Sequence, residues 1–211
     1  MLTMKNYLIG LTLAFAVSSP LAAQTQKLPV YGEIGLGVGQ TLFGSGTRAS
    51  LQRALGGSGF DPGTGNNVMM GFYVAPENWH GLGVGSRIRG TFGAPVKGDA
   101  GDQYIFNYYN LALSAKYYVS GQFNRGFYGR GSFGFGQFTT KRLIESSNIF
   151  AHQYAIGTSV MLGAGYTVPF RRTALSLEGE WESASRNGTV NGVGDVRFRS
   201  GQLGVNLILS Y

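Results

Sequence analysis

The sequence contains no cysteine and only 6 prolines in 211 residues, and charged residues make up 13% of it. Without cysteine the protein has neither disulfides nor a lipid-modified cysteine anchor. The scarcity of proline and the lack of a regular Gly-X-Y repeat exclude a collagen-like chain. No run of 18 apolar residues occurs between Val30 and Tyr211, so no helical membrane span is expected there.

Glycine and apolar residues take the place of the missing charges. The chain has 35 glycines, and 43% of its residues are hydrophobic and 13% aromatic, whereas glycine usually makes up about 7% of a protein and charged residues about 25%. This hydrophobic content excludes a disordered chain, and the length fits one folded domain.

The amino terminus has the features of an export signal. Lys5 supplies a positive charge, residues 8–17 form an apolar run, and small residues follow up to Ala23. A helix of about ten residues spans roughly 15 Å, about half of the hydrocarbon core of a bilayer. We therefore predict a cleaved signal peptide at residues 1–23 and a single exported domain at residues 24–211.

Apolar residues alternate with small or polar ones along most of that domain. In residues 82–92, for example, Leu82, Val84 and Ile88 alternate with Gly83, Arg87 and other small or charged residues. A period of two is typical of strands with one apolar and one polar face. The pattern predicts eight strands at 30–43, 68–75, 82–92, 103–119, 126–140, 153–168, 173–183 and from about 195 to 211.

The expected connections alternate between long and short. The long ones are residues 44–67, 93–102, 141–152 and 184–194, and the short ones are 76–81, 120–125 and 169–172. Outer-membrane barrels have short turns at one end and long loops at the other. The sequence therefore predicts an all-β protein, a single eight-stranded antiparallel up-and-down transmembrane β-barrel.

Two soluble β architectures fit the pattern less well. A lipocalin-like barrel packs apolar residues inside and carries ordinary charge outside, whereas the apolar faces here carry almost no charge. A soluble sandwich needs solvated residues at half of its strand positions, and most polar positions here are glycine, serine or isolated ions.

The inward face is expected to hold a balanced set of ions. An eight-stranded barrel is just wide enough for side chains to fill it, and buried ions must be paired or hydrated. We expect a lumen filled by salt bridges and water, with a gated ion path as the alternative. The predicted ionic network consists of Glu33, Arg87, Arg89, Lys116, Arg130, Glu178, Glu180 and Glu182.

The residues give little support to catalysis or to cofactor binding. Alternate glutamates such as Glu178 and Glu180 have four cations available to pair with, which disfavours a metal site or an acid catalyst. A hydrolase would need His152 beside Ser146 or Ser147, and His80 is expected at the opposite end of the barrel. The glycine runs lie inside strands and lack the helix that a phosphate-binding loop requires. We predict no enzyme activity, catalytic residue, metal or cofactor.

The outward face is expected to contact lipid, with aromatic rings near the membrane boundaries. Candidates for these girdles are Tyr31, Tyr104, Tyr108, Tyr117, Phe127, Tyr154, Tyr166 and Tyr211.

Basic residues near the predicted long loops suggest contact with lipopolysaccharide phosphates. Arg197 and Arg199 share the outward phase of Leu203, and Lys141 and Arg142 lie in an expected loop. No dense basic stripe suggests nucleic acid.

The last ten residues, QLGVNLILSY, resemble the terminal strand signature of outer-membrane proteins. With the signal peptide and the eight alternating strands, the chain resembles small outer-membrane barrels of the OmpA, OmpX and OmpW kind. The resemblance implies insertion by the barrel-assembly machinery through Leu207, Leu209 and Tyr211, contact with outer-membrane lipids, and a monomer in the bacterial outer membrane.

The function that this resemblance implies is a non-enzymatic structural or surface-interaction role. A narrow OmpW-like channel for small apolar solutes is the main alternative. A lipid-modifying hydrolase that uses His152 is a more distant one.

Overall fold

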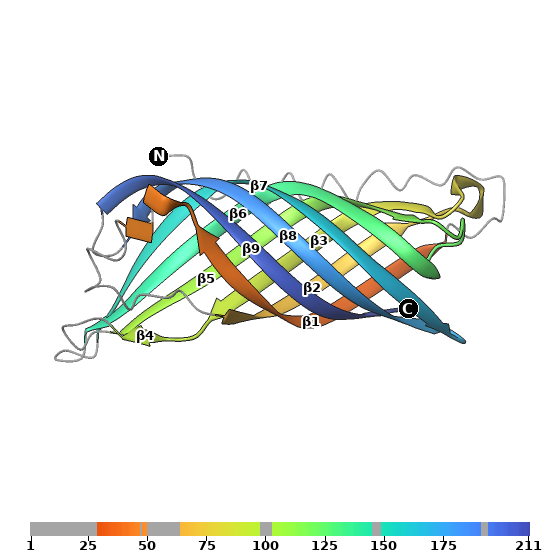
Figure 1. Ribbon diagram of the computed structural model, residues 1–211, viewed down its shortest axis with the longest axis horizontal. Coiled ribbons are helices and arrows are strands. Elements are labelled where there is room, and N and C mark those ends of the chain that lie inside the picture. The colour runs from red at the N-terminus through yellow and green to blue at the C-terminus, as the bar shows by residue number, and fades with distance from the viewer. Residues whose placement is uncertain (1–28, 47, 50–63, 98–102, 145–148, 191–193) are drawn as a thin grey trace, which may run out of the picture.

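The computed structural model describes residues 29–46, 48–49, 64–97, 103–144, 149–190 and 194–211. These residues form a closed antiparallel barrel of eight long strands (Figure 1), which confirms the predicted fold class. The signal peptide predicted at residues 1–23 lies outside the described residues. No described helix is long and apolar enough to cross a membrane.

The strands follow one another around the barrel in chain order. Their bounds are β1 Val30–Phe43, β2 Thr64–Val74, β3 Leu82–Gly93, β4 Val96–Lys97, β5 Gln103–Tyr118, β6 Gly126–Ile144, β7 Ile149–Phe170, β8 Thr173–Val190 and β9 Gly194–Ser210. The two-residue β4 pairs with the first two residues of β5, and a short 3-10 helix, η1 Glu77–Trp79, lies between β2 and β3. Pairing of β1 with β9 and of β3 with β5 closes the cylinder.

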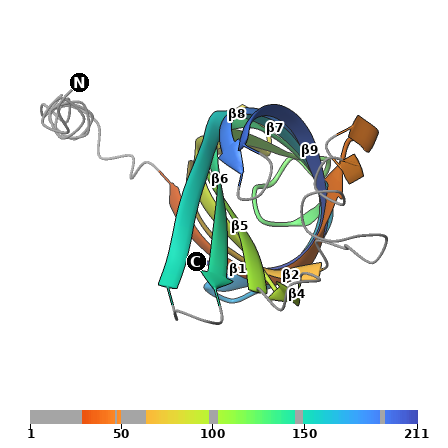
Figure 2. The ribbon, with the colours of Figure 1, turned by 90° about the vertical axis from the view of Figure 1, so that its left-hand side faces the viewer.

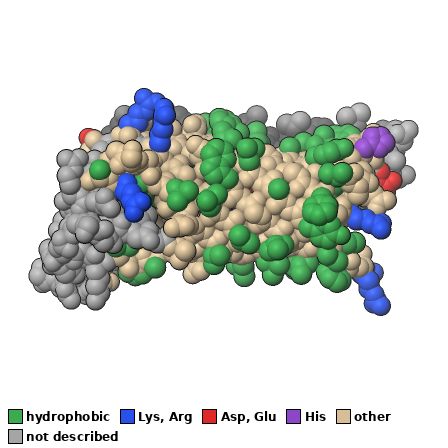
Figure 3. Space-filling model, in the orientation of Figure 1, with side chains coloured by type: hydrophobic (Ala, Val, Ile, Leu, Met, Phe, Trp, Pro, Cys, Tyr) green, Lys and Arg blue, Asp and Glu red, His purple; other side chains and the backbone are tan. Residues whose placement is uncertain are grey.

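The two faces of each strand differ in exposure, as the alternation predicts. Outward side chains such as Leu36, Leu113 and Phe127 are 63 to 74% exposed, whereas inward Lys116 is fully buried. Figure 3 shows hydrophobic side chains distributed over the outer wall between charged side chains near the two ends. The outer surface is therefore apolar and the interior polar, the reverse of a soluble barrel.

The two ends of the barrel differ. The connections 75–81, 119–125 and 171–172 lie at one end, here called the turn end, together with the start of β1 and the finish of β9. The ends of β1, β3, β6 and β8 and the starts of β2, β5, β7 and β9 lie at the other, the loop end.

The predicted bounds of β1 agree with the structure, but several others are wrong. β2 begins at Thr64 rather than Val68. β6 continues to Ile144, β7 begins at Ile149 and β8 continues to Val190, so these strands extend into the expected loops 141–152 and 184–194. Near the loop end the outward positions become polar, as at Ser183 and Ser185. The alternation of apolar and polar residues stops there, although the hydrogen-bonded pairing of the strands continues.

Several inward glycines permit close approach inside the barrel. An ideal Cβ on Gly35 would lie 2.6 Å from Cγ of Met69, and one on Gly157 would lie 2.7 Å from Cα of Arg186. Glycine at these positions therefore makes room in a narrow lumen.

Candidate functional site

The ionisable side chains predicted to point inward come together in the lumen. β1 supplies Glu33, β3 supplies two arginines, β5 and β6 supply Lys116 and Arg130, and β8 supplies three glutamates. All eight residues are at most 4% exposed. They occupy the inward phase of their strands, so the backbone alternation alone brings charges from five strands onto one axis.

The first part of this cluster lies toward the turn end. The Lys116 ammonium pairs with Glu33 Oε1, and Arg130 Nη2 donates to Glu33 Oε2 at 2.9 Å. Nε of Arg130 lies 3.2 Å from Glu178 Oε2. Lys116 Nζ also lies 4.4 Å from the centre of the Tyr128 ring. Glu33 is thus shared between two cations, and Arg130 links it to the next glutamate.

The second part continues along β8 toward the loop end. Arg87 pairs with Glu180 and lies 4.0 Å from Glu178. Nη1 of Arg89 lies 2.5 Å from Glu180 and 3.2 Å from Glu182. Because each glutamate contacts two cations, the pairs join into one chain of alternating charges.

Arg186 completes the chain, although the sequence pattern predicts a loop at its position. Its Nη2 donates to Glu182 Oε1 at 2.9 Å and its Nη1 to Ser200 Oγ at 2.8 Å. Its guanidinium also lies 5.4 Å from the centre of the Tyr108 ring. Arg186 was assigned to a loop, but β8 extends past it and its even number gives it the inward phase of Glu182.

We call these nine side chains the charge ladder. In order from the turn end they are Lys116, Glu33, Arg130, Glu178, Arg87, Glu180, Arg89, Glu182 and Arg186. Five cations face four anions, so the described ladder carries one surplus positive charge, where the sequence predicted a neutral set.

Neutral polar side chains hold the ladder in place on its loop side. Arg89 Nη2 donates to Gln202 Oε1 at 2.8 Å, and Thr91 Oγ1 donates to Asn67 Oδ1 at 2.8 Å. The Asn67 amide donates in turn to Asn206 Oδ1 at 3.1 Å. These bonds connect β2, β3 and β9 across the lumen.

An aromatic group lies at the turn end. The connection 119–125 folds over the opening, and Figure 2 shows it as a pale green loop inside the ring of strands. It carries Phe123, whose ring centre lies 4.8 Å from that of Tyr31, 5.0 Å from Tyr118 and 6.0 Å from Tyr73. We call this group the turn-end plug.

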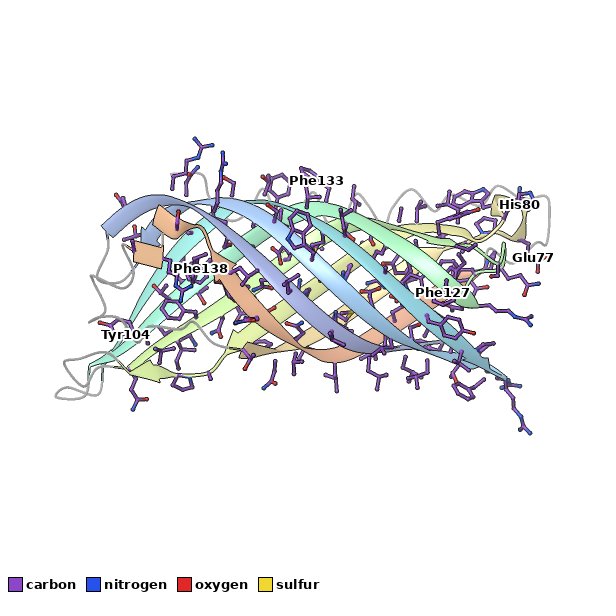
Figure 4. The ribbon with its side chains drawn as sticks, viewed as in Figure 1. Glu77, His80, Tyr104, Phe127, Phe133 and Phe138 are labelled. Carbon is purple, nitrogen blue, oxygen red and sulfur yellow. The ribbon has the colours of Figure 1, made fainter. Side chains whose placement is uncertain are left out.

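A second aromatic group lies inside the loop end, where Figure 4 labels Tyr104 and Phe138. The Phe138 ring lies 5.7 Å from that of Phe106, 4.7 Å from Tyr108 and 6.1 Å from Phe43. The prediction that Tyr104 and Tyr108 belong to outer girdles is therefore wrong. Their even numbers give them the inward phase of Lys116 on β5.

The predicted basic contact residues lie near the loop end. Arg197 and Arg199 are exposed on β9. Lys141 is half-buried, and both Lys141 and Arg142 belong to β6 rather than to the expected loop. They were misassigned because the apolar alternation ends before the strand does; the side chain of Arg142 lies outside the described residues.

The predicted assembly residues lie on the outward face of β9. Leu207, Leu209 and Tyr211 are 45 to 60% exposed. Tyr211 exchanges two backbone hydrogen bonds of 3.0 Å with Gly32, and an ideal Cβ on Gly32 would lie 2.6 Å from the Tyr211 ring. The terminal tyrosine thus covers a glycine at the seam between β9 and β1.

The residues considered for catalysis do not form a described site. His80 is exposed at the turn end with a φ of 49°, whereas His152 belongs to the loop-end part of β7. The side chain of His152 and residues Ser146 and Ser147 lie outside the described part of the chain. Within that part, no three His, Cys, Asp or Glu side chains are grouped to hold a metal ion.

No protein-family model matches the sequence, and no curated protein matches it. Solved structures do match the fold. Ail, the attachment invasion locus protein of Yersinia pestis, in complex with the heparin analogue sucrose octasulfate, aligns with a TM-score of 0.53 at 12% identity, covering 86% of this chain and 99% of Ail. A second Ail structure gives a TM-score of 0.51 at 11% identity over 86% and 98% of the two chains.

This likeness identifies the class of fold. The chain is an eight-stranded barrel of the outer-membrane type, and the predicted resemblance to small outer-membrane barrels is confirmed at the level of fold. At 11 to 12% identity the comparison shows the fold only. The function has to be inferred from the residues of this chain.

Proposed function

We propose that the protein is a non-enzymatic barrel of the bacterial outer membrane that acts through its outer surface rather than through its lumen. The apolar wall favours a lipid environment, and the short connections favour a periplasmic turn end and an external loop end. Export through a cleaved signal peptide, insertion by the barrel-assembly machinery and a monomeric state belong to the same proposal.

The observation that carries this proposal is the filled lumen. The charge ladder occupies its middle with buried, mutually paired ions. Aromatic rings centred on Phe123 and Phe138 occupy the two ends. A permeating solute would have to separate ion pairs in a region of low dielectric, which is costly.

The external partner proposed here is a polyanionic glycan, with lipopolysaccharide as the first candidate. Arg197 and Arg199 project from β9 on the same side as the lipid-facing residues, where guanidinium groups can bind phosphates with charge-assisted hydrogen bonds. Lys141 and Arg142 are further candidates. The fold likeness to Ail adds support, since one of the Ail structures is a complex with a sulfated sugar analogue.

The test replaces Arg197 and Arg199 by glutamine and compares thermal stability in lipopolysaccharide with that in neutral detergent. We expect a lower Tm in lipopolysaccharide only, with a difference that shrinks as salt rises because exposed charges are screened. Replacement of both residues by lysine is the matched control, since it keeps the charge. Equal losses in both media would contradict the proposed contact.

The OmpW-like channel is a weaker candidate. It needs apolar side chains that line the external mouth, and the rings of Phe106, Tyr108 and Phe138 do lie there. These rings are 1 to 4% exposed, so they pack on one another. Saturable binding of an aromatic solute, lost in Phe138→Ala, would favour the channel over the surface role.

A further inference from the structure

A basic hollow lies at the turn end, outside the charge ladder. It has a volume of about 270 Å³ and lies between the connection 119–125 and the two-residue turn 171–172. Its walls include three arginines, Arg125, Arg171 and Arg172, and the rings of Tyr31 and Tyr211.

Few negatively charged groups neutralise these three arginines. Arg125 Nη1 donates to Gln122 Oε1 at 3.1 Å, and within the described residues Arg171 and Arg172 have no ion pair. Glu77 lines an adjoining hollow that shares Phe123 with this one. Glu33 accepts a hydrogen bond from Ser210 of the lining, but it is already paired with Lys116 and Arg130. The rim of the hollow therefore attracts anions.

The backbone at Arg171 is in a conformation that disfavours arginine. Arg171 has a φ of 44°, in the left-handed region. Two-residue hairpin turns favour asparagine or glycine at such positions, and other residues are held there against a penalty. This conformation holds Arg171 at the tip of the turn beside Arg172.

The neighbouring residues place the arginines at the level of lipid headgroups. Phe127, Tyr166, Phe170 and Tyr211 are 47 to 69% exposed on the outer wall next to the hollow, and the rings of Phe127 and Tyr166 lie 4.7 Å apart. Exposed aromatic rings mark the boundary between hydrocarbon and headgroups. Arg125, Arg171 and Arg172 lie just beyond this boundary.

We propose that this hollow binds the headgroup phosphate of an anionic phospholipid in the leaflet at the turn end. Guanidinium groups bind phosphate oxygens in pairs, and a hollow flanked by exposed rings leaves room for the acyl chains against the wall. A zwitterionic headgroup carries its own cation, which the three arginines repel. The site therefore prefers phosphatidylglycerol to phosphatidylcholine.

The experiment measures lipid binding to the folded protein in neutral detergent by native mass spectrometry, with phosphatidylglycerol and phosphatidylcholine as probes. We expect the parent protein to prefer phosphatidylglycerol by about tenfold or more. The triple variant Arg125→Gln, Arg171→Asn, Arg172→Gln should lose this preference. Its Tm without lipid should be unchanged or higher, because asparagine tolerates the left-handed turn.

Matched variants separate the site from general charge. Arg172→Gln should weaken phosphatidylglycerol binding, whereas Arg48→Gln, which removes an exposed arginine at the loop end, should not. Glu77→Gln should leave the binding intact or strengthen it. Equal effects of Arg172→Gln and Arg48→Gln would overturn the proposal. So would inorganic phosphate that raises the Tm of lipid-free protein as much as phosphatidylglycerol does, because the ligand would then be free phosphate.

Discussion

Each glutamate of the charge ladder contacts two cations, so the loss of a glutamate and the loss of a cation have different consequences. Removing Glu180 takes a partner from both Arg87 and Arg89. Removing the terminal Arg186 leaves Glu182 paired with Arg89. The ladder would hold five cations and three anions in the first case, and four of each in the second.

The first prediction concerns Glu180→Gln. Breaking a buried pair by removing one partner typically costs about 3–5 kcal/mol, and we expect the free energy of unfolding to fall by about that amount. Denaturant titration of the folded barrel in lipid vesicles measures it. The control is Glu77→Gln in a surface turn, which should change the stability by about 0.5 kcal/mol or less. Similar losses in both variants would show that the ladder contributes nothing to stability.

The second prediction concerns Arg186→Gln. Its loss removes hydrogen bonds to Glu182 and Ser200 but also removes the surplus positive charge. We expect a cost of about 1.5–3 kcal/mol, the usual range for hydrogen bonds to charged groups, measured by the same titration. A loss of unfolding free energy as large as that of Glu180→Gln would contradict the position of Arg186 at the end of the charge ladder.

At the scale of the elements, the sequence predicts the β-strands better than it predicts their ends. The bounds predicted for β1 agree with the structure, and the phase assigned to Lys116, Arg130 and Glu178 agrees with their buried positions. The loop-end part of β8 was missed because its outward residues become polar, as at Ser183 and Ser185, while its backbone pairing with β7 and β9 continues. Arg186 was missed for the same reason.

The turn-end plug could not be predicted from the sequence. Phe123 lies in a short connection, and no alternation indicates that its ring turns back over the barrel opening to meet Tyr31 and Tyr118. That arrangement depends on contacts between residues more than 90 positions apart for Tyr31, which local patterns do not encode. The inward position of Tyr104 and Tyr108, by contrast, could have been predicted. Both residues share the inward phase of Lys116 in β5.

The third prediction is a double-mutant cycle on the plug. An ideal Cβ on Gly83 would lie 2.8 Å from Cζ of Phe123, so Gly83→Ala should lower the stability by about 1–3 kcal/mol through overpacking. In a Phe123→Ala background the same change should cost close to nothing, because the ring is gone. Unfolding titrations of the four proteins give the coupling. Equal costs of Gly83→Ala in both backgrounds would show that Phe123 does not pack over the opening.

At the scale of the whole molecule, our proposals give separate tasks to the two rims and to the lumen. The lumen is filled by paired ions and closed by aromatic rings, while exposed arginines lie near both ends. In the proposed division, the loop end binds a glycan, the turn end binds a phospholipid, and the interior stabilises the barrel.

The most direct test of this account is the conductance of the refolded barrel in a planar bilayer, with folding verified in the same preparation. The account predicts that the folded protein shows no steady current steps, because the charge ladder and the turn-end plug close the lumen. Steady ohmic steps whose size changes in Glu180→Gln would contradict it, and would make the ladder the constriction of an open pore.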